Sequence, residues 1–241
     1  MRKLIAEGFV IFTSIIASFS VENYRESNEE KEILNDAVIT LGDEIDSNIL
    51  YTKEHLKQVR NMLYVTKETF DNFDNINLDE IFRIHSNNPY MHSIIENGEI
   101  EYIKKYQESY MIFVWSNAWE PENIFFKSML NSGKLLEIKN KKLRREIESI
   151  YTKQEERVSG MAKLTGDVSA NLILWFDNKQ DSFNKDITIT KVFNDHKNQK
   201  LKNILSRRKT NLEYRVKDIE NYLQALQNVV LLISTEYKKL D

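Results

Sequence analysis

The residue types that most often carry chemistry are few in this sequence, and their spacing fits no catalytic or metal-binding pattern. The four histidines lie far apart: His55, His85, His92 and His196. Only His92 and Glu96 have the spacing that puts two ligands on one helical face, and an isolated pair of this kind is typical of a helix surface. Cysteine is absent, which excludes thiolate ligands, cysteine nucleophiles and disulfides. We therefore expect no metal site.

Phosphate loops and nucleophile elbows are missing as well. Gly160 and Gly166 are followed by Asp167, where a nucleotide-binding loop carries Lys and a hydroxyl residue. No serine lies in an expected strand–turn–helix elbow. The sequence therefore predicts no catalytic residue, no cofactor and no enzymatic activity.

An aromatic-rich stretch, residues 99–119, is one candidate for a ligand pocket. If the stretch is helical, Tyr102, Tyr106, Tyr110 and Phe113 share a face, with Trp115 and Trp119 close by. Large rings bury the most area, so the same pattern also fits the core at the distal end of a bundle. The residues predicted to line a distal aromatic pocket are Tyr106, Tyr110, Trp115 and Trp119.

Glu7 is the other candidate, because it is the one ionisable side chain inside an apolar stretch, residues 4–21. A carboxylate at bilayer depth is costly and often marks function. Glu7 also lies one turn from the start of this stretch, near the interface, where the helix dipole favours negative charge. Two interpretations stay open: an interfacial residue, or an intramembrane polar contact between neighbouring anchor helices.

Residues 1–21 are expected to form a transmembrane signal anchor. Residues 4–21 in a helix would rise about 27 Å, close to the hydrocarbon core of about 30 Å. Arg2 and Lys3 precede the apolar stretch and an acidic segment follows it, which favours a cytoplasmic N-terminus and an extracytoplasmic C-terminal domain, in the bacterial inner membrane. Two alternatives are a cleaved signal peptide, with Ser18 and Ser20 before the cut, and a buried core or oligomer helix.

Glycine and proline are scarce, at 6 and 2 of 241 residues. Sheet folds need frequent turns that use these residues, so the sequence predicts an all-α fold with long helices. The net charge of −3 offers no basic field for nucleic acid. Basic residues in the segments 139–145 and 207–209 are diluted by nearby acids and are expected on solvated helix faces.

Apolar residues that recur every three or four positions predict an elongated antiparallel helical bundle with long, coiled-coil-like arms. After the anchor, residues 22–241 would form the extracytoplasmic bundle. Its expected parts are a first arm (22–70), a broken aromatic-rich distal section (71–139), a third helix (140–177) and a return arm (194–241). Within the broken section, Asn88 and Pro89 are expected to begin a helix. Residues 187–193 alternate like a strand and are expected to lead into the last helix.

Several short segments, taken in chain order, carry a family resemblance. They are residues 6–17 with Glu7 and Gly8, then Asn23-Tyr24-Arg25-Glu26, the segment 130–135 followed by 138–144, and residues 193–205. Together they resemble a family of short bacterial single-pass membrane proteins of unknown function. The resemblance implies an anchor and an extracytoplasmic helical domain, and it implies no activity and no functional residues.

These patterns predict a non-enzymatic single-pass membrane protein that presents a helical bundle for protein–protein interaction, scaffolding or sensing. The expected partners are the lipid bilayer, a protein that the sequence does not identify and further copies of the chain in a homo-oligomer, with no nucleic acid. The alternative is an oligomeric membrane effector or pore subunit whose anchor helices assemble around Glu7. A third hypothesis is a small-ligand binder or enzyme that uses the aromatic stretch.

Overall fold

The computed structural model describes residues 2–94, 100–103, 110–183 and 187–237, without the side chains of residues 2–14 and 94. The predicted all-α bundle is confirmed, since most described residues are helical and the described strands form one small hairpin. In chain order the elements are α1 (Arg2–Asp71), α2 (Leu78–Asn87), β1 (His92–Ile94), β2 (Ile100–Tyr102), α3 (Met111–Val114), α4 (Ile124–Asn131), α5 (Lys134–Glu137), α6 (Lys141–Ser149), the π-helical turn η1 (Ile150–Gln154), α7 (Glu155–Asp181), α8 (Ile189–His196) and α9 (Gln199–Glu236).

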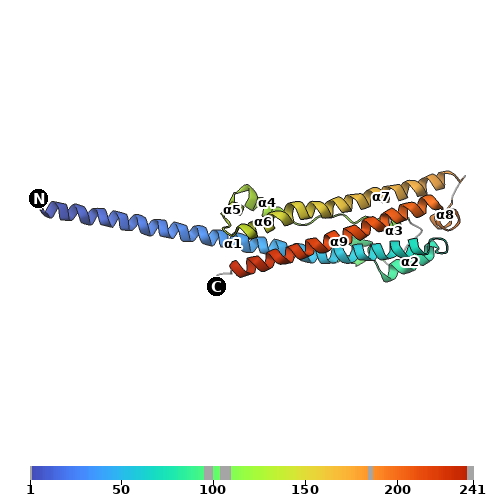
Figure 1. The fold of residues 1–241 in the computed structure, drawn as a ribbon, viewed down its shortest axis with the longest axis horizontal. Helices are drawn as coiled ribbons and strands as arrows, with labels where there is room; N and C mark the ends of the chain where they lie inside the picture. Colours follow the sequence, from blue (N-terminus) through green and yellow to red (C-terminus); the bar gives the residue numbers. More distant parts are fainter. Residues whose placement is uncertain (1, 95–99, 104–109, 184–186, 238–241) are drawn as a thin grey trace.

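Helices α1 and α9 run antiparallel and form the long axis of the molecule, with α7 packed along α9 (Figure 1). Their direction follows from contacts at both ends. Lys209 lies 3.9 Å from Asp71 at the distal end, and Ile233 packs against Gly42 at the other. Apolar side chains of the three helices are fully buried between them, including Leu41, Ile45, Val59, Leu172, Leu212, Ile219 and Leu226.

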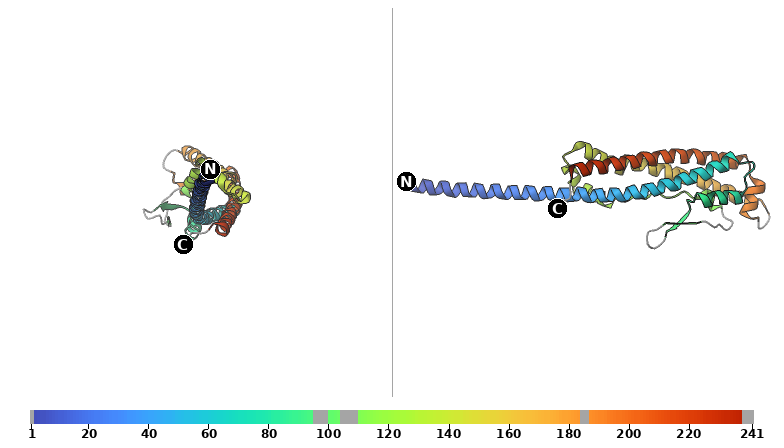
Figure 2. Two further views of the ribbon diagram at one scale, coloured as in Figure 1. Left: turned by 90° about the vertical axis from the view of Figure 1, so that its left-hand side faces the viewer. Right: turned by 90° about the horizontal axis from the view of Figure 1, so that it is seen from below.

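The part of α1 before Ala37 projects beyond the bundle, and we call it the stem (Figures 1 and 2). Most of its described apolar side chains are exposed, including Ile15, Phe19 and Val21, whereas Leu34 near its end packs against the core. Glu7 belongs to the helical backbone of the stem, but its side chain lies outside the described residues. Among the side chains that the structure describes, no helix is long and apolar enough to cross a membrane.

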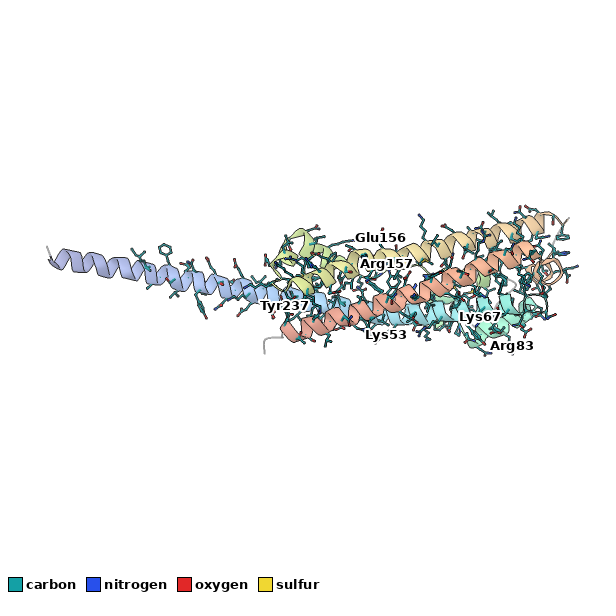
Figure 3. All side chains as sticks on the ribbon, in the orientation of Figure 1. Lys53, Lys67, Arg83, Glu156, Arg157 and Tyr237 are labelled. Carbon is teal, nitrogen blue, oxygen red and sulfur yellow. The ribbon has the colours of Figure 1, made fainter. Side chains whose placement is uncertain are left out.

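Outside the stem, charged side chains cover the outer faces of the helices while apolar ones fill the space between them. Figure 3 marks Lys53 and Lys67 on α1 and Glu156 and Arg157 on α7, all of which are exposed. This distribution is the one that the apolar stripes predict, because only one face of each helix contacts its neighbours.

The third helix begins where the sequence places it and ends later. The Asn140 side chain accepts hydrogen bonds from the amides of Lys142 (2.9 Å) and Leu143 (3.1 Å), which caps α6. The helix then continues through η1 and α7 to Asp181 rather than ending at 177. Its Gly160 costs helix propensity but does not interrupt the hydrogen-bond ladder.

The return arm is two helices, which corrects the single arm expected from residue 194. Thr188 caps α8, since its hydroxyl accepts from the amide of Lys191 at 3.2 Å, so the strand-like alternation of residues 187–193 belongs to a helix. Asn198 caps α9 by accepting from the amide of Leu201 at 3.2 Å. Two strong N-caps close together therefore break the chain between α8 and α9.

The helix start expected at Asn88 and Pro89 is wrong. Asn88 instead ends α2, where its amide donates to the carbonyls of Ile84 and His85. The chain then runs on in extended form, because the His85 ring accepts from the amides of Tyr90 (3.1 Å) and Met91 (3.3 Å). The His85 ring thus binds the amides that an Asn88 cap would have bound at the start of a helix.

The described residues with aromatic spacing in the segment 99–119 do not share one helical face. Strands β1 and β2 pair antiparallel, with His92 opposite Tyr102, and among the described residues of this stretch Met111–Val114 alone is helical, before an extended segment. His92 therefore does not share a helix with Glu96, which lies outside the described residues. The Tyr102 hydroxyl donates to the Glu54 carboxylate on α1, so a tertiary contact holds this part of the chain in strand form.

The segment 71–139 is not confined to the distal end. Its last part returns along the bundle, and α4 packs on α1, where the amide of Phe125 donates to Glu44 Oε2 at 2.6 Å. The Asn140 side chain then donates to Glu236 near the end of α9. The aromatic-rich segment therefore lies along the side of the bundle. A pocket formed by it would lie there too, and not at the distal tip.

Candidate functional site

A cleft of about 700 Å³ opens between α1 and the extended chain that follows α3. Its walls come from three parts of the fold: Tyr51, Glu54, His55 and Gln58 on α1; His92 and Ile100 on the hairpin; and Met111, Val114, Trp115, Ser116, Asn117, Ala118 and Glu120. This volume is in the range of small-molecule sites. The cleft is therefore the main candidate for a functional site in the described structure.

One wall of the cleft is an extended segment, Trp115 to Glu120, which we call the strap. Its backbone has no strand partner, so side chains of neighbouring helices bind it. The Tyr51 hydroxyl accepts from the amide of Glu120 at 2.9 Å, and the Asn117 amide group donates to Gln58. Asn117 has a φ of 56°, a left-handed conformation that Asn tolerates better than most residues.

Two buried arginines of α9 lie behind the strap. Arg208 is 1% exposed and donates to the Trp115 carbonyl (2.5 Å) and the Ser169 hydroxyl (2.6 Å). Arg215 is 0% exposed and donates to the carbonyls of Ser116 (2.5 Å) and Asn117 (2.6 Å). Burial lowers the pKa of each guanidinium to about 10, and Arg208 adds to the shift at Arg215. Both side chains are therefore still charged at neutral pH.

No described carboxylate pairs with either guanidinium. The described ion pairs involve other cations, as in Arg60 with Glu220 and Lys57 with Glu54. Buried charges are usually paired because desolvation costs several kcal/mol per ion. The interior beside the strap is consequently positive, and only neutral oxygens and one imidazole stabilise it.

His55 is that imidazole. Its Nε2 lies 2.9 Å from Arg215 Nη2, and because arginine can only donate, Nε2 is the acceptor and Nδ1 carries the proton. Burial, Arg215 and then His92 lower the pKa of His55 to about 3, so the ring is neutral. His85 behaves similarly, since burial lowers its pKa to about 4 and its ring accepts two amide hydrogen bonds.

Of the four residues predicted to line one aromatic pocket, the three that the structure describes do not lie together. Trp115 lines the cleft and contacts His92 edge to face, with ring centroids 5.6 Å apart. Trp119 packs between α1 and α9, against His55 and Tyr222. Tyr110 stacks on Phe176 of α7 instead, and Tyr106 lies outside the described residues.

Several buried polar atoms around the strap have no hydrogen-bond partner among the described residues: His92 Nδ1, Trp115 Nε1, Trp119 Nε1, Arg215 Nε and the Tyr222 hydroxyl. Both indole nitrogens and Arg215 Nε can only donate. An unpaired buried donor costs about 1–3 kcal/mol, so such groups are uncommon in a folded interior. Their concentration here favours a ligand that supplies acceptors.

Sequence reasoning missed the two arginines, and the expectation of a solvated face for residues 207–209 is wrong at Arg208. The sequence does indicate that both arginines are buried, because they fall on the apolar stripe of α9, at the spacing of Leu205, Leu212 and Ile219. Position on that stripe predicts burial whatever the residue type. His55 shows the same signal on α1, beside the buried Leu56 and Val59.

The site has the groups for binding an acceptor-rich ligand, and its described groups do not form a nucleophile–base pair. Within the part of the chain that the structure describes, no group of side chains has the composition of a metal site. Comparisons with family models, curated proteins and solved structures find no match to this chain. The interpretation of the site therefore depends on its own geometry.

Proposed function

We propose that this chain is a non-enzymatic, single-pass membrane protein whose helical bundle senses a ligand or partner outside the cytoplasm. The observation that carries the proposal is the continuity of α1, from Arg2 to Asp71. This one helix joins the apolar N-terminal stretch to Tyr51, His55 and Gln58 in the wall of the cleft. A change in the cleft would then reach the stem through a single rigid element.

The stem supports the membrane part of the proposal. Ile15, Ile16 and Phe19 are about half exposed or more, and the bundle covers none of them. Apolar side chains gathered on one unpacked helix are favourable in a bilayer or against another copy of the same helix. The charge asymmetry around residues 4–21 and the family resemblance favour an anchor with a cytoplasmic N-terminus.

A second surface supports interaction with a protein partner. At the stem end of the bundle, α4 and α5 expose Ile124 (82%), Leu130 (51%) and Leu136 (68%). Isolated exposed apolar residues are normal, but three on adjacent short helices are typical of a contact surface. A partner bound there would lie next to the stem. Scaffolding or signalling through α1 requires a partner in this position.

Fractionation of cells that express the full chain with a C-terminal tag tests the proposal. We expect the chain to stay in membranes after alkaline carbonate, and the tag to be digested by protease added to spheroplasts. A variant without residues 2–21 should be released while it keeps its helical circular-dichroism spectrum. Recovery of the full chain in the soluble fraction, or a mature protein whose mass lacks the N-terminal stretch, would refute the proposed anchor.

A further inference from the structure

The interior beside the strap carries more positive charge than the described chain neutralises. Arg208 and Arg215 are both buried, and their described partners are carbonyl oxygens, the Ser169 hydroxyl and neutral His55. Carbonyl dipoles solvate a cation but do not cancel its charge. An anion held close to this pair would recover part of the desolvation cost of both ions.

The unpartnered atoms nearby favour the same kind of ligand. The rings of Trp115 and His92 meet in the cleft wall, and neither Trp115 Nε1 nor His92 Nδ1 has a partner in the described structure. Arg215 Nε, on a fully buried side chain, is also unpartnered. An oxyanion is the ligand whose oxygens can accept from an indole, an imidazole and a guanidinium together.

We infer that the cleft binds a small molecule through an oxyanion, a carboxylate or phosphate group, held beside Trp115 and His92 and attracted by the charge of the buried Arg215 behind the strap. The inference rests on the proposed sensing function, for which it names the class of ligand. The cleft is also lined by the apolar side chains of Ile100, Met111 and Val114, which suit a short organic body attached to the oxyanion. The cleft is large enough for such a molecule, at about 700 Å³.

The acidic side chains of the cleft do not oppose this assignment. Glu54 accepts from the Tyr102 hydroxyl and lies 3.6 Å from Lys57 Nζ, so its charge is already balanced at the rim. Glu120 is exposed to solvent, where its field is screened. Neither of these two carboxylates therefore balances the charge of the buried arginines.

The strap has room to move away from the cleft. On its other face, a second hollow of about 410 Å³ lies between Ser116 to Trp119 and α7. Gly166 lines this hollow, and a Cβ added there would meet no atom within 4 Å. A shift of the strap into this hollow would widen the cleft for a ligand beside Trp115.

Ligand titrations of the purified full chain test the inference. The probes are sodium phosphate, sulfate, acetate and benzoate, with sodium chloride at equal ionic strength as the control. We expect at least one oxyanion to raise the thermal midpoint saturably, and to change the fluorescence of the tryptophans, well beyond chloride. A response to phosphate and sulfate would assign a tetrahedral group, and a response to acetate or benzoate a carboxylate.

Two conservative variants locate the site. Trp115→Phe and His92→Phe each remove one ring N–H or nitrogen while keeping an aromatic ring, and each should weaken binding about tenfold or more. The matched control is Trp175→Phe, because the Trp175 indole already donates to Asn198 (3.1 Å) away from the cleft. Its dissociation constant should equal that of the unmodified chain. Arg215→Lys should weaken binding further. If the Arg215→Lys variant fails to fold, the two ring variants still test the site.

The inference is overturned if no oxyanion stabilises the full chain beyond chloride. It is equally overturned if Trp115→Phe and His92→Phe bind as tightly as Trp175→Phe. Because binding is measured on purified protein and anchoring on membrane fractions, this inference and the proposed membrane location can fail separately.

Discussion

Substitution of Glu44 tests which contacts hold the aromatic-rich segment against the bundle. Its side chain is 9% exposed, and its carboxylate accepts from the amides of Phe125 (2.6 Å) and Phe126 (3.2 Å) and from the Tyr151 hydroxyl (2.7 Å). It thus joins α1 to the start of α4 and to η1. The amides at the start of α4 also favour a negative charge, because they form the positive end of the helix dipole.

The variant Glu44→Gln keeps the size of this side chain but replaces one acceptor oxygen with an NH₂ group that faces a donor. Hydrogen bonds to a charged group contribute about 1.5–3 kcal/mol, and a mispaired buried donor costs a similar amount. After local relaxation we expect a loss of about 2–3 kcal/mol in the free energy of unfolding. For a chain of this size, that loss lowers the thermal midpoint by about 5–10 °C.

Thermal and urea unfolding followed by circular dichroism measures this change. Asp43→Asn is the matched control, because Asp43 is the exposed neighbour of Glu44 and should change stability by less than about 0.5 kcal/mol. In a double-mutant cycle, Glu44→Gln and Tyr151→Phe should show a coupling of about 1 kcal/mol. If Glu44→Gln is as stable as Asp43→Asn, the fastening role assigned to this carboxylate is refuted.

Three further predictions concern other parts of the chain. Burial holds the pKa of His85 near 4, below its unfolded value of about 6.5, so its stabilising effect is complete above about pH 6.5 and is lost as pH falls towards 4; thermal midpoints from pH 7 to 4 should show this fall, and His85→Gln should reduce it to the part that His55 contributes through its own pKa of about 3. Gly133→Ala should destabilise by about 1 kcal/mol because Gly133 has a φ of 78°, whereas Gly160→Ala, in a helix with open space around it, should stabilise by about 0.5–1 kcal/mol in urea unfolding. In planar bilayers neither the full chain nor Glu7→Gln should conduct ions; a ring of copies whose conductance falls in Glu7→Gln would establish the pore alternative instead.

The helices were predictable where local signals define them. Asn140 begins the third helix, and the stripe with Leu212 and Ile219 marks the core face of α9, because caps and periodicity are properties of neighbouring residues. The prediction failed where a distant contact decides the local structure. Tyr102 lies in a strand beside Glu54 of α1, although the aromatic spacing around it fits a helix.

The sequence alone determined the fold class, since scarce glycine and proline and long apolar stripes leave little except extended helices. The apolar stripe also passes through Arg208 and Arg215, although the basic segment 207–209 was expected on a solvated face. Only the tertiary structure decided what those arginines contact. Their partners Ser116 and Asn117 are 99 and 98 residues away from Arg215 along the chain, in a segment without regular structure. Periodicity reports which face of a helix is buried, whereas the partner of a buried charge depends on which distant segment packs against that face.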